Sequence, residues 1–332
     1  MQTFTERGNM IREPDTRTKD ERAGTKSCPL CKGGATQEFL RAPDRFHLRR
    51  EVYKLMRCAE CGCVWLADPP TPAEMGAHYS EDYHRAIAKA GETAAEIRWR
   101  RHNELISQYQ RGGSILDIGC SSGAFLGTLK GNWKLYGIEM ERATAERARA
   151  ATGADVFVGD VMDAPFAPGS FDAITCFDLL EHVYDPSVFL ARVLEWLKPG
   201  GMVFVMLPNI ESWEARAFGS YWYGLELPRH TFHFSPGSLR YVMGSLGFRE
   251  VHLQTPPITY VERSLGYLGA AGLEKLGLEA APQSRPKPAG IPKRILRKAL
   301  RVGCFGPLGA IESLAGAAGS MEAVFRKPPI KA

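Results

Sequence analysis

The loop Asp117–Gly123, with the sequence Asp-Ile-Gly-Cys-Ser-Ser-Gly, holds the residues best suited to bind a cofactor. It follows a short apolar stretch and precedes a helix that we expect to begin at Gly123, which is where doubly wound α/β folds hold nucleotides. Two of the three glycines of a dinucleotide fingerprint are missing. The Asp117 carboxylate would repel a pyrophosphate but attract an ammonium group. The loop therefore favours a cofactor that carries an ammonium group.

Acidic residues also follow the next two predicted strands. Glu139 comes directly after residues 134–138, and its carboxylate can accept hydrogen bonds from both hydroxyls of a ribose. Asp160 follows residues 156–158 and can accept a hydrogen bond from the amino group of an adenine. Together with Asp117, they indicate a cofactor that combines adenosine with an ammonium group.

Four cysteines form two Cys-x-x-Cys pairs, Cys28 with Cys31 and Cys58 with Cys61, and a glycine follows each pair within two residues. Four thiolates at this spacing predict a structural Zn²⁺ site, and the lack of an export signal favours metal over disulfides. The metal would stabilise a module whose core is too small to fold alone. We expect Cys63, close to the second pair, not to be a ligand.

From residue 112 onward, predicted strands alternate with predicted helices. The strands are expected at 115–118, 134–138, 156–158, 173–177, 202–207, 249–254 and 321–326. Helices are expected from Gly123, from Glu141, over 187–197 and over 236–246, the last with Ser235 as its N-cap. This alternation predicts a doubly wound α/β fold around a mostly parallel sheet of seven strands.

The composition divides the chain further. Residues 1–26 are predicted to be a disordered tail, because they are polar and charged with almost no apolar periodicity. The expected parts after this tail are a zinc ribbon (27–72), a helical linker (73–111), the α/β domain (112–257), a basic helical insertion (258–319) and a last strand (320–328).

The order of these motifs resembles that of class I S-adenosylmethionine-dependent methyltransferases. The motifs are Ile115–Leu126, Glu139, Gly159–Asp160, Phe171–Asp172, Leu180–Val183 and Leu197–Gly201, within residues 100–257. The chain departs from the family at Ser121, where a second glycine is common. The resemblance implies S-adenosylmethionine contacts at Asp117, Gly119, Glu139, Asp160 and Asp178, and the predicted site also includes Cys120, Ser121, Gly123, Met140 and Val161.

The N-terminal module is similar to that of bacterial methyltransferases encoded with polysaccharide and glycolipid synthesis. The resemblance rests on the cysteine pairs, on the segment that begins at Trp65 and on residues 79–83. It also extends to sugar C-methyltransferases. It implies an acceptor that is a sugar or a lipid-linked glycan.

Three histidines are candidates for the base that removes a proton from the acceptor: His182, His230 and His233. The resemblance implies that residues at these positions line the active site. Alternatively, His182 could hydrogen-bond across a helix start, and one of His230 and His233 could orient the loop of the other. An aromatic segment, from Trp213 to Tyr223, precedes the last two. It could stack on sugar faces or form a packed hydrophobic loop.

Residues 291–303 predict a basic amphipathic helix. Such a helix could lie on an anionic membrane, pack on its own domain or bind RNA. The formal net charge of +5 does not by itself indicate a nucleic-acid partner. Without a signal sequence or an apolar run of about 20 residues, the protein is expected to be cytoplasmic, with peripheral contact at the inner face of the membrane.

The sequence thus favours methyl transfer to a small-molecule sugar or a lipid-linked glycan. One alternative is an RNA methyltransferase that grips phosphates with the zinc ribbon and the basic insertion. Another is a non-catalytic protein that senses the cofactor, although such a protein need not keep the acids at 117, 139 and 160.

Overall fold

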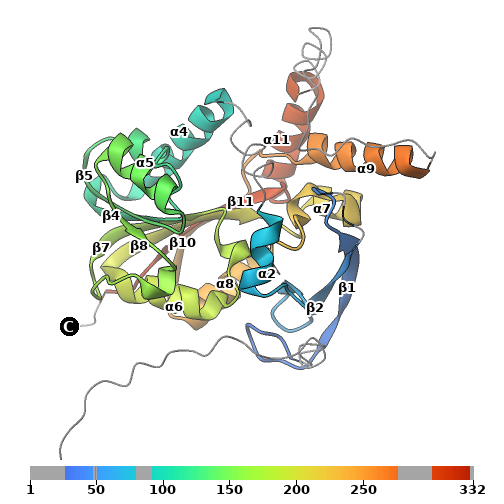
Figure 1. Cartoon of the computed structure of the whole chain (residues 1–332), viewed down its shortest axis with the longest axis horizontal. Coiled ribbons are helices and arrows are strands. Elements are labelled where there is room, and N and C mark those ends of the chain that lie inside the picture. Colours follow the sequence, from blue (N-terminus) through green and yellow to red (C-terminus); the bar gives the residue numbers. More distant parts are fainter. Residues whose placement is uncertain (1–26, 48, 50, 80–91, 276–300, 330–332) are drawn as a thin grey trace, which may run out of the picture.

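The computed structural model describes residues 27–47, 49, 51–79, 92–275 and 301–329, which include two β-sheets (Figure 1). The larger sheet has the strand order β10-β11-β8-β7-β4-β5-β6. Its strands are β4 (Gly112–Ile118), β5 (Asn132–Glu139), β6 (Asp155–Val158), β7 (Phe171–Phe177), β8 (Leu197–Pro208), β10 (Arg249–Gln254) and β11 (Ser320–Arg326). β4 to β8 run parallel, whereas β11 is antiparallel to β8 and β10. The predicted doubly wound, mostly parallel sheet of seven strands is confirmed.

Helices bury both faces of this sheet. They are α4 (Glu92–Tyr109), α5 (Arg142–Thr152), α6 (Pro186–Trp196) and α8 (Pro236–Ser245). Trp196 of α6 and Leu239 of α8 are buried in the core of one face. Ile106 of α4 and Ala148 of α5 are buried on the other face. Ser235 is the N-cap of α8, as predicted, and its hydroxyl accepts a hydrogen bond from the N–H of Ser238 (3.2 Å).

The helix expected from Gly123 is absent. Only the single-turn 3₁₀ helix Leu126–Thr128 follows the loop. Two further glycines interrupt the segment and β5 already begins at Asn132, so the chain has no room for a stable helix here. α4, which precedes the loop in sequence, covers this part of the sheet instead: its Trp99 ring lies 5.8 Å from that of Phe125.

The smaller sheet has the order β1-β2-β3-β9. Its strands are β1 (Thr36–Pro43), β2 (Val52–Cys58), β3 (Val64–Leu66) and β9 (Phe232–His233). β9 belongs to the chain that follows the larger sheet's β8, and it pairs antiparallel with β3, with Val64 opposite His233. The N-terminal module therefore takes its fourth strand from the loop that carries two of the predicted histidines.

Further helices lie before α4, between β8 and β9, and in the predicted insertion. They are α2 (Pro72–Met75), the 3₁₀ helix Gly76–His78, α7 (Trp213–Phe218), α9 (Val261–Lys275), the π-helix Arg301–Phe305 and α11 (Gly306–Leu314). Among the described helices, none combines the length and apolar character that a bilayer span requires. The tail predicted at 1–26, and residues 291–300 of the predicted basic helix, lie outside the described residues.

One ion pair connects α4 to the sheet. Glu322 of β11 is 2% exposed, and its carboxylate accepts two hydrogen bonds from Arg101, both 3.0 Å long. Arg101→Met would leave this buried charge without its guanidinium and should lower the free energy of unfolding by about 3 kcal/mol in urea denaturation. Arg100→Met is the control, because the pair of Arg100 with Glu104 is exposed to solvent. Equal losses in the two variants would contradict the interpretation.

Candidate active site

Four carboxylates gather at the carboxyl edge of the parallel strands. Asp117 lies in β4, Glu139 ends β5, and Asp160 and Asp178 follow β6 and β7. These four strands are neighbours in the sheet, so the acids line one continuous edge. Arg98 of α4 donates a hydrogen bond to Asp178. The structure thus brings together the acidic residues that the sequence predicted to hold the cofactor.

Asp117 is the most deeply buried of these acids. It is 5% exposed, and the Thr175 hydroxyl donates a hydrogen bond to its Oδ1 (2.6 Å). Burial raises the pKa of Asp117 to about 7, although the bond from Thr175 favours the ionised form. A neighbouring positive charge would pull this pKa down again. The position therefore suits an ammonium group and disfavours a phosphate.

The backbone of the loop after Asp117 offers little to a phosphate either. The N–H groups of Gly119 and Cys120 donate to one carbonyl of β5, at 2.9 and 3.0 Å. The N–H of Ser121 donates to a carboxylate oxygen at 3.0 Å, and the N–H of Gly123 donates within the loop at 2.9 Å. Phosphate-binding loops need such N–H groups free. The loop fits S-adenosylmethionine, which has no phosphate, better than a dinucleotide.

The remaining predicted cofactor residues differ in what they expose. The Met140 side chain is 73% exposed beside the acidic edge, which suits stacking on an adenine, and Val161 is half-buried. Cys120 is turned into the core and is 3% exposed. Ser121 has a φ of +48°, in the left-handed region that favours glycine, which explains why the family often has glycine at this position.

The three predicted catalytic histidines form one cluster. The ring centroids of His182 and His230 are 4.6 Å apart, and those of His230 and His233 are 6.1 Å apart. His230 and His233 are buried, and His182 is half-buried. Residues from two separate loops, one after β7 and one beside β9, therefore meet at this point.

Each of these histidines donates one ring N–H to a backbone carbonyl, and all three bonds are 3.0 Å long: Nδ1 donates in His182 and His230, and Nε2 donates in His233. Because a carbonyl only accepts, the other ring nitrogen of each neutral histidine keeps its lone pair. Burial lowers the pKa of all three histidines, that of His233 to about 4. They are neutral at pH 7 and can each accept a proton.

Three more residues of this cluster were not predicted. Both carboxylate oxygens of Glu181 are buried without a hydrogen-bond partner among the described residues, and burial raises the pKa of Glu181 well above its ordinary range. The Tyr79 hydroxyl lies 3.1 Å from His182 Nδ1, and Glu226 Oε2 lies 3.6 Å from His230 Nε2. Glu181 directly precedes a predicted histidine and was within reach of sequence reasoning. Tyr79 and Glu226 belong to no predicted motif, and the folded structure alone brings them next to the histidines.

Asp44, in the turn after β1, links the N-terminal module to the histidine loop. Its Oδ2 lies 2.9 Å from His47 Nδ1, 3.2 Å from His78 Nδ1 and 3.4 Å from a terminal nitrogen of Arg229. The side chains of Asp44 and Arg229 are both fully buried. Burial opposes ionisation of Asp44, but the charges and hydrogen bonds of Arg229 and His47 hold its pKa below the ordinary value. The network therefore fixes Arg229, which directly precedes His230.

The histidine loop is also held from its other side. The N–H of Thr231 donates to the Glu181 carbonyl (2.9 Å), and the Thr231 hydroxyl donates to the Val183 carbonyl (2.8 Å). Since β9 begins at the next residue and pairs with β3, the loop is bonded both to the segment after β7 and to the smaller sheet within three residues. Its histidines are thus positioned with little freedom to move.

The aromatic segment before this loop is largely packed rather than open. Trp222 and Tyr223 are buried, and the Tyr223 ring stacks on that of Tyr267 with centroids 5.8 Å apart. Trp213 is 43% exposed. For Trp222 and Tyr223, the structure therefore favours the interpretation of a packed hydrophobic loop.

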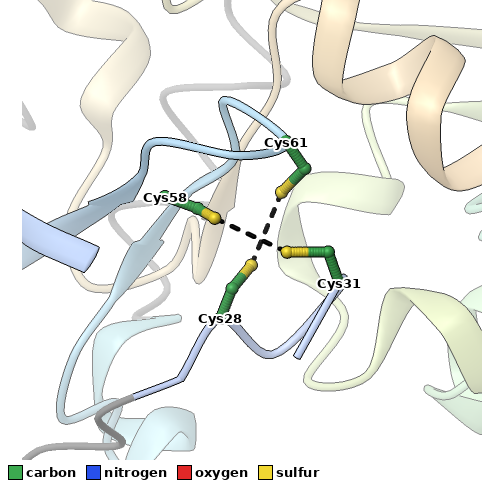
Figure 2. Close-up of side chains that lie close together, drawn as sticks. All are labelled: Cys28, Cys31, Cys58 and Cys61. Atoms are coloured by element: carbon green, nitrogen blue, oxygen red, sulfur yellow. Dashed lines mark hydrogen bonds between the residues drawn. The ribbon is translucent and has the colours of Figure 1, made fainter. Parts of the chain in front are cut away.

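The four predicted metal ligands converge at the end of the smaller sheet (Figure 2). Cys28 Sγ lies 3.5 Å from Cys61 Sγ, and Cys31 Sγ lies 3.5 Å from Cys58 Sγ. All four sulfur atoms lie within 4.8 Å of one another, and four thiolates around a tetrahedral Zn²⁺ would be separated by about 3.8 Å. The N–H of Gly33 points to Cys31 Sγ at 3.4 Å. The donor set fits a structural zinc ion.

A family model described as a methyltransferase domain matches residues 80–253, slightly more than half of the chain. The chain belongs to this methyltransferase family. The match begins after the cysteine module and ends with β10, so it covers most of the larger sheet and the cofactor edge, and it reaches the histidine cluster.

Curated relatives of this methyltransferase are similar over part of their length. A protein of Mycolicibacterium smegmatis named a probable S-adenosylmethionine-dependent methyltransferase is 26% identical, over 55% of this chain and 67% of the relative. The ubiquinone biosynthesis O-methyltransferase of Thiobacillus denitrificans is 31% identical, over 37% of this chain and 57% of the relative. The chain thus spans little more than half of the latter enzyme.

Solved structures are similar over more of the chain but at lower identity. An S-adenosylmethionine-dependent methyltransferase from Thermotoga maritima is 19% identical with a TM-score of 0.49, and covers 76% of this chain and 99% of its own. One from Archaeoglobus fulgidus is 16% identical with a TM-score of 0.45, and covers 70% and 94%.

The environment of Asp117 predicts a pH-dependent affinity for S-adenosylmethionine. The pKa of Asp117 in the folded protein lies above its ordinary value of 3.8, so its contribution to stability falls as pH rises from about 4 to 7. An ammonium group needs the ionised form, so the dissociation constant should fall about eightfold between about pH 6 and 7.5 in calorimetry.

Asp117→Asn should bind the cofactor more weakly and without this pH dependence, and Asp117→Ala should weaken binding more than Ser121→Gly does. Ser121→Gly is the matched control, because it leaves the carboxylate in place and should keep the pH dependence. An Asp117→Asn variant with the pH profile of the wild type would refute the role of this carboxylate.

The cysteine cluster predicts one zinc ion per chain in elemental analysis of the purified protein. Cys58→Ser should lose the metal and lower the melting temperature, because Cys58 ends β2 beside the strand that pairs with the histidine loop. Cys304→Ser removes an exposed thiol outside the cluster and should keep both the metal and the stability. A wild-type protein that contains no metal, and whose melting temperature does not change when zinc is added, would contradict this assignment.

Proposed function

We propose that this methyltransferase transfers the methyl group of S-adenosylmethionine to a hydroxyl of a sugar or lipid-linked glycan, with His230 as the general base. The observation that supports this most directly is the buried histidine cluster beside the acidic edge, in which each histidine keeps one ring nitrogen with a lone pair. Zinc at the four cysteines would have a structural role only, because four thiolates leave no open coordination position.

The cofactor would supply a methyl group on a positively charged sulfur, which an acceptor oxygen can displace in line. His230 Nδ1 is held as a donor to a carbonyl, so Nε2 would take the proton that the acceptor oxygen loses as its bond to the methyl carbon forms. Glu226 Oε2, 3.6 Å from Nε2, would stabilise the imidazolium. The proton would thus pass from the acceptor oxygen to His230 Nε2.

His182 and His233 have supporting roles in this proposal. His182 contacts Tyr79, and its ring packs edge-to-face against the His230 ring with an interplanar angle of 81°. His182 would therefore hold the His230 ring in place. His233 lies within β9, whose pairing with β3 restricts its backbone. His230 lies between them and is the histidine with a carboxylate next to its free nitrogen, which favours it as the base.

The polar groups around the cluster favour a polyhydroxyl acceptor. Glu181 and Glu226 offer carboxylate oxygens and Tyr79 offers a phenol, all of which can bond to sugar hydroxyls. The Glu226 carboxylate, next to His230, would repel a phosphate at the reacting centre. The resemblance of the N-terminal module to that of polysaccharide and glycolipid methyltransferases supports the same class.

A radiolabelled methyl assay against separated cell fractions tests this proposal. Label from S-adenosylmethionine should enter the nucleotide-sugar fraction or the lipid extract, and acid hydrolysis should release it as a methylated sugar. Label in a precursor of ubiquinone, the pathway named for the O-methyltransferase relatives, or in RNA would overturn the choice of acceptor. No incorporation into any fraction would count against catalysis.

His230→Gln should reduce kcat in this assay by about 10²- to 10⁴-fold, because it removes the base. Its affinity for S-adenosylmethionine should stay unchanged. His252→Gln, which alters a histidine of β10 away from the cluster, is the control. Equal rates for the two variants would exclude His230 as the base. Because burial holds the His230 pKa low, the wild-type kcat at saturating S-adenosylmethionine should stay constant down to pH 6.

A further inference from the structure

Two helices of the insertion, α9 and α11, project from the body of the molecule near α7 (Figure 1). They are separated in sequence by the basic segment identified above. Both helices expose apolar side chains, whereas the charged residues of a soluble protein's surface helix normally point outward. The outer faces of α9 and α11 therefore need a separate explanation.

The polarity of α11 is reversed. Its one charged residue, Glu312, is 2% exposed and lies against Glu214, and burial raises the pKa of Glu312 to about 7. Leu308, Ile311 and Leu314 follow one another at helical spacing and are 38%, 55% and 89% exposed. The helix thus buries its acid and presents an apolar stripe.

The outer face of α9 is similar. Leu265 and Leu268 are 47% and 39% exposed, and no charged residue occurs from Ser264 to Gly272. The opposite face of the helix packs on the body, where Ser264 and Tyr267 are buried. We define the docking face as the exposed apolar side chains Leu265, Leu268, Leu308, Ile311 and Leu314.

The sequence between the two helices supplies charge of one sign. Seven lysines or arginines occur from Arg285 to Arg301, and no acid occurs between Ala280 and Ile311. Apolar side chains next to a basic segment match the chemistry of an anionic bilayer, which offers acyl chains beneath negative headgroups.

We propose that the docking face binds the protein peripherally to membranes that contain anionic lipids. The face is connected to the active site through α9. The Ser264 hydroxyl accepts a hydrogen bond from the N–H of Tyr223 (3.0 Å), and Tyr267 stacks on the Tyr223 ring. Tyr223 begins the short 3₁₀ helix that leads into the histidine loop. An acceptor held in the membrane would therefore lie on the same side of the molecule as α9, whose contacts with Tyr223 support the histidine loop.

Sedimentation with lipid vesicles tests this surface without measuring methyl transfer, so its outcome is separate from that of the proposed function. The full-length protein should sediment with vesicles of equal phosphatidylglycerol and phosphatidylcholine at low salt, and much less with phosphatidylcholine alone. Ile311→Ser/Leu314→Ser should lower the partition coefficient about tenfold or more. Both residues are exposed, so the melting temperature should not change.

Val52→Ser/Tyr241→Ser is the control, because it removes two large apolar residues that are 58% and 44% exposed elsewhere on the surface. It should bind vesicles like the wild type. The proposal is wrong if the wild type does not sediment with anionic vesicles or if the two double variants bind equally. It is also wrong if Ile311→Ser/Leu314→Ser converts a dimer to a monomer in light scattering, or abolishes binding to an RNA oligonucleotide, since the face would then serve another partner.

Discussion

The pairing of β3 with β9 is the interaction on which the rest of the active site depends. It joins a strand of the cysteine module to the segment between Arg229 and Ser235, and it does so beside the hydrogen bonds from Thr231 to the loop after β7. Two-residue strands are weak by themselves. This one is sustained because the buried pair of Asp44 and Arg229 connects the same two parts of the chain.

The acidic edge and the histidine cluster divide the chemistry between them. The edge is built by the sheet alone, where parallel strands end side by side and place Asp117, Glu139, Asp160 and Asp178 in a row. Its negative charge and its occupied backbone N–H groups select the kind of cofactor. The cluster is built by two loops and the N-terminal module, and its low dielectric keeps the imidazoles neutral. Cofactor binding thus depends on the strands of the larger sheet, whereas proton transfer depends on loops held by the N-terminal module.

The features that could be predicted from the sequence are those that depend on residues close together in the chain. The strands of the larger sheet, the acids beside them and the cysteine pairs follow from apolar periodicity and from spacing within a few residues. The prediction of a helix after Gly123 was wrong. The strand-then-helix order of the fold suggested it, but the glycines of this segment and the early start of β5 prevent it. Asp44, Tyr79 and Arg229 could not be found, since their roles arise from contacts between segments more than 100 residues apart. Glu181 could have been found beside His182.

The mixed origin of the smaller sheet bears on how such enzymes can be recombined. A cysteine module cut at residue 72 would lose β9 and expose β3 as an edge strand beside a hydrophobic core. The catalytic part without the module would lose Asp44, the buried counter-ion of Arg229. A chimera that changes acceptor specificity would therefore have to exchange the module and the segment around Arg229–Ser235 as one piece. These two segments have to be exchanged together although almost half of the chain separates them.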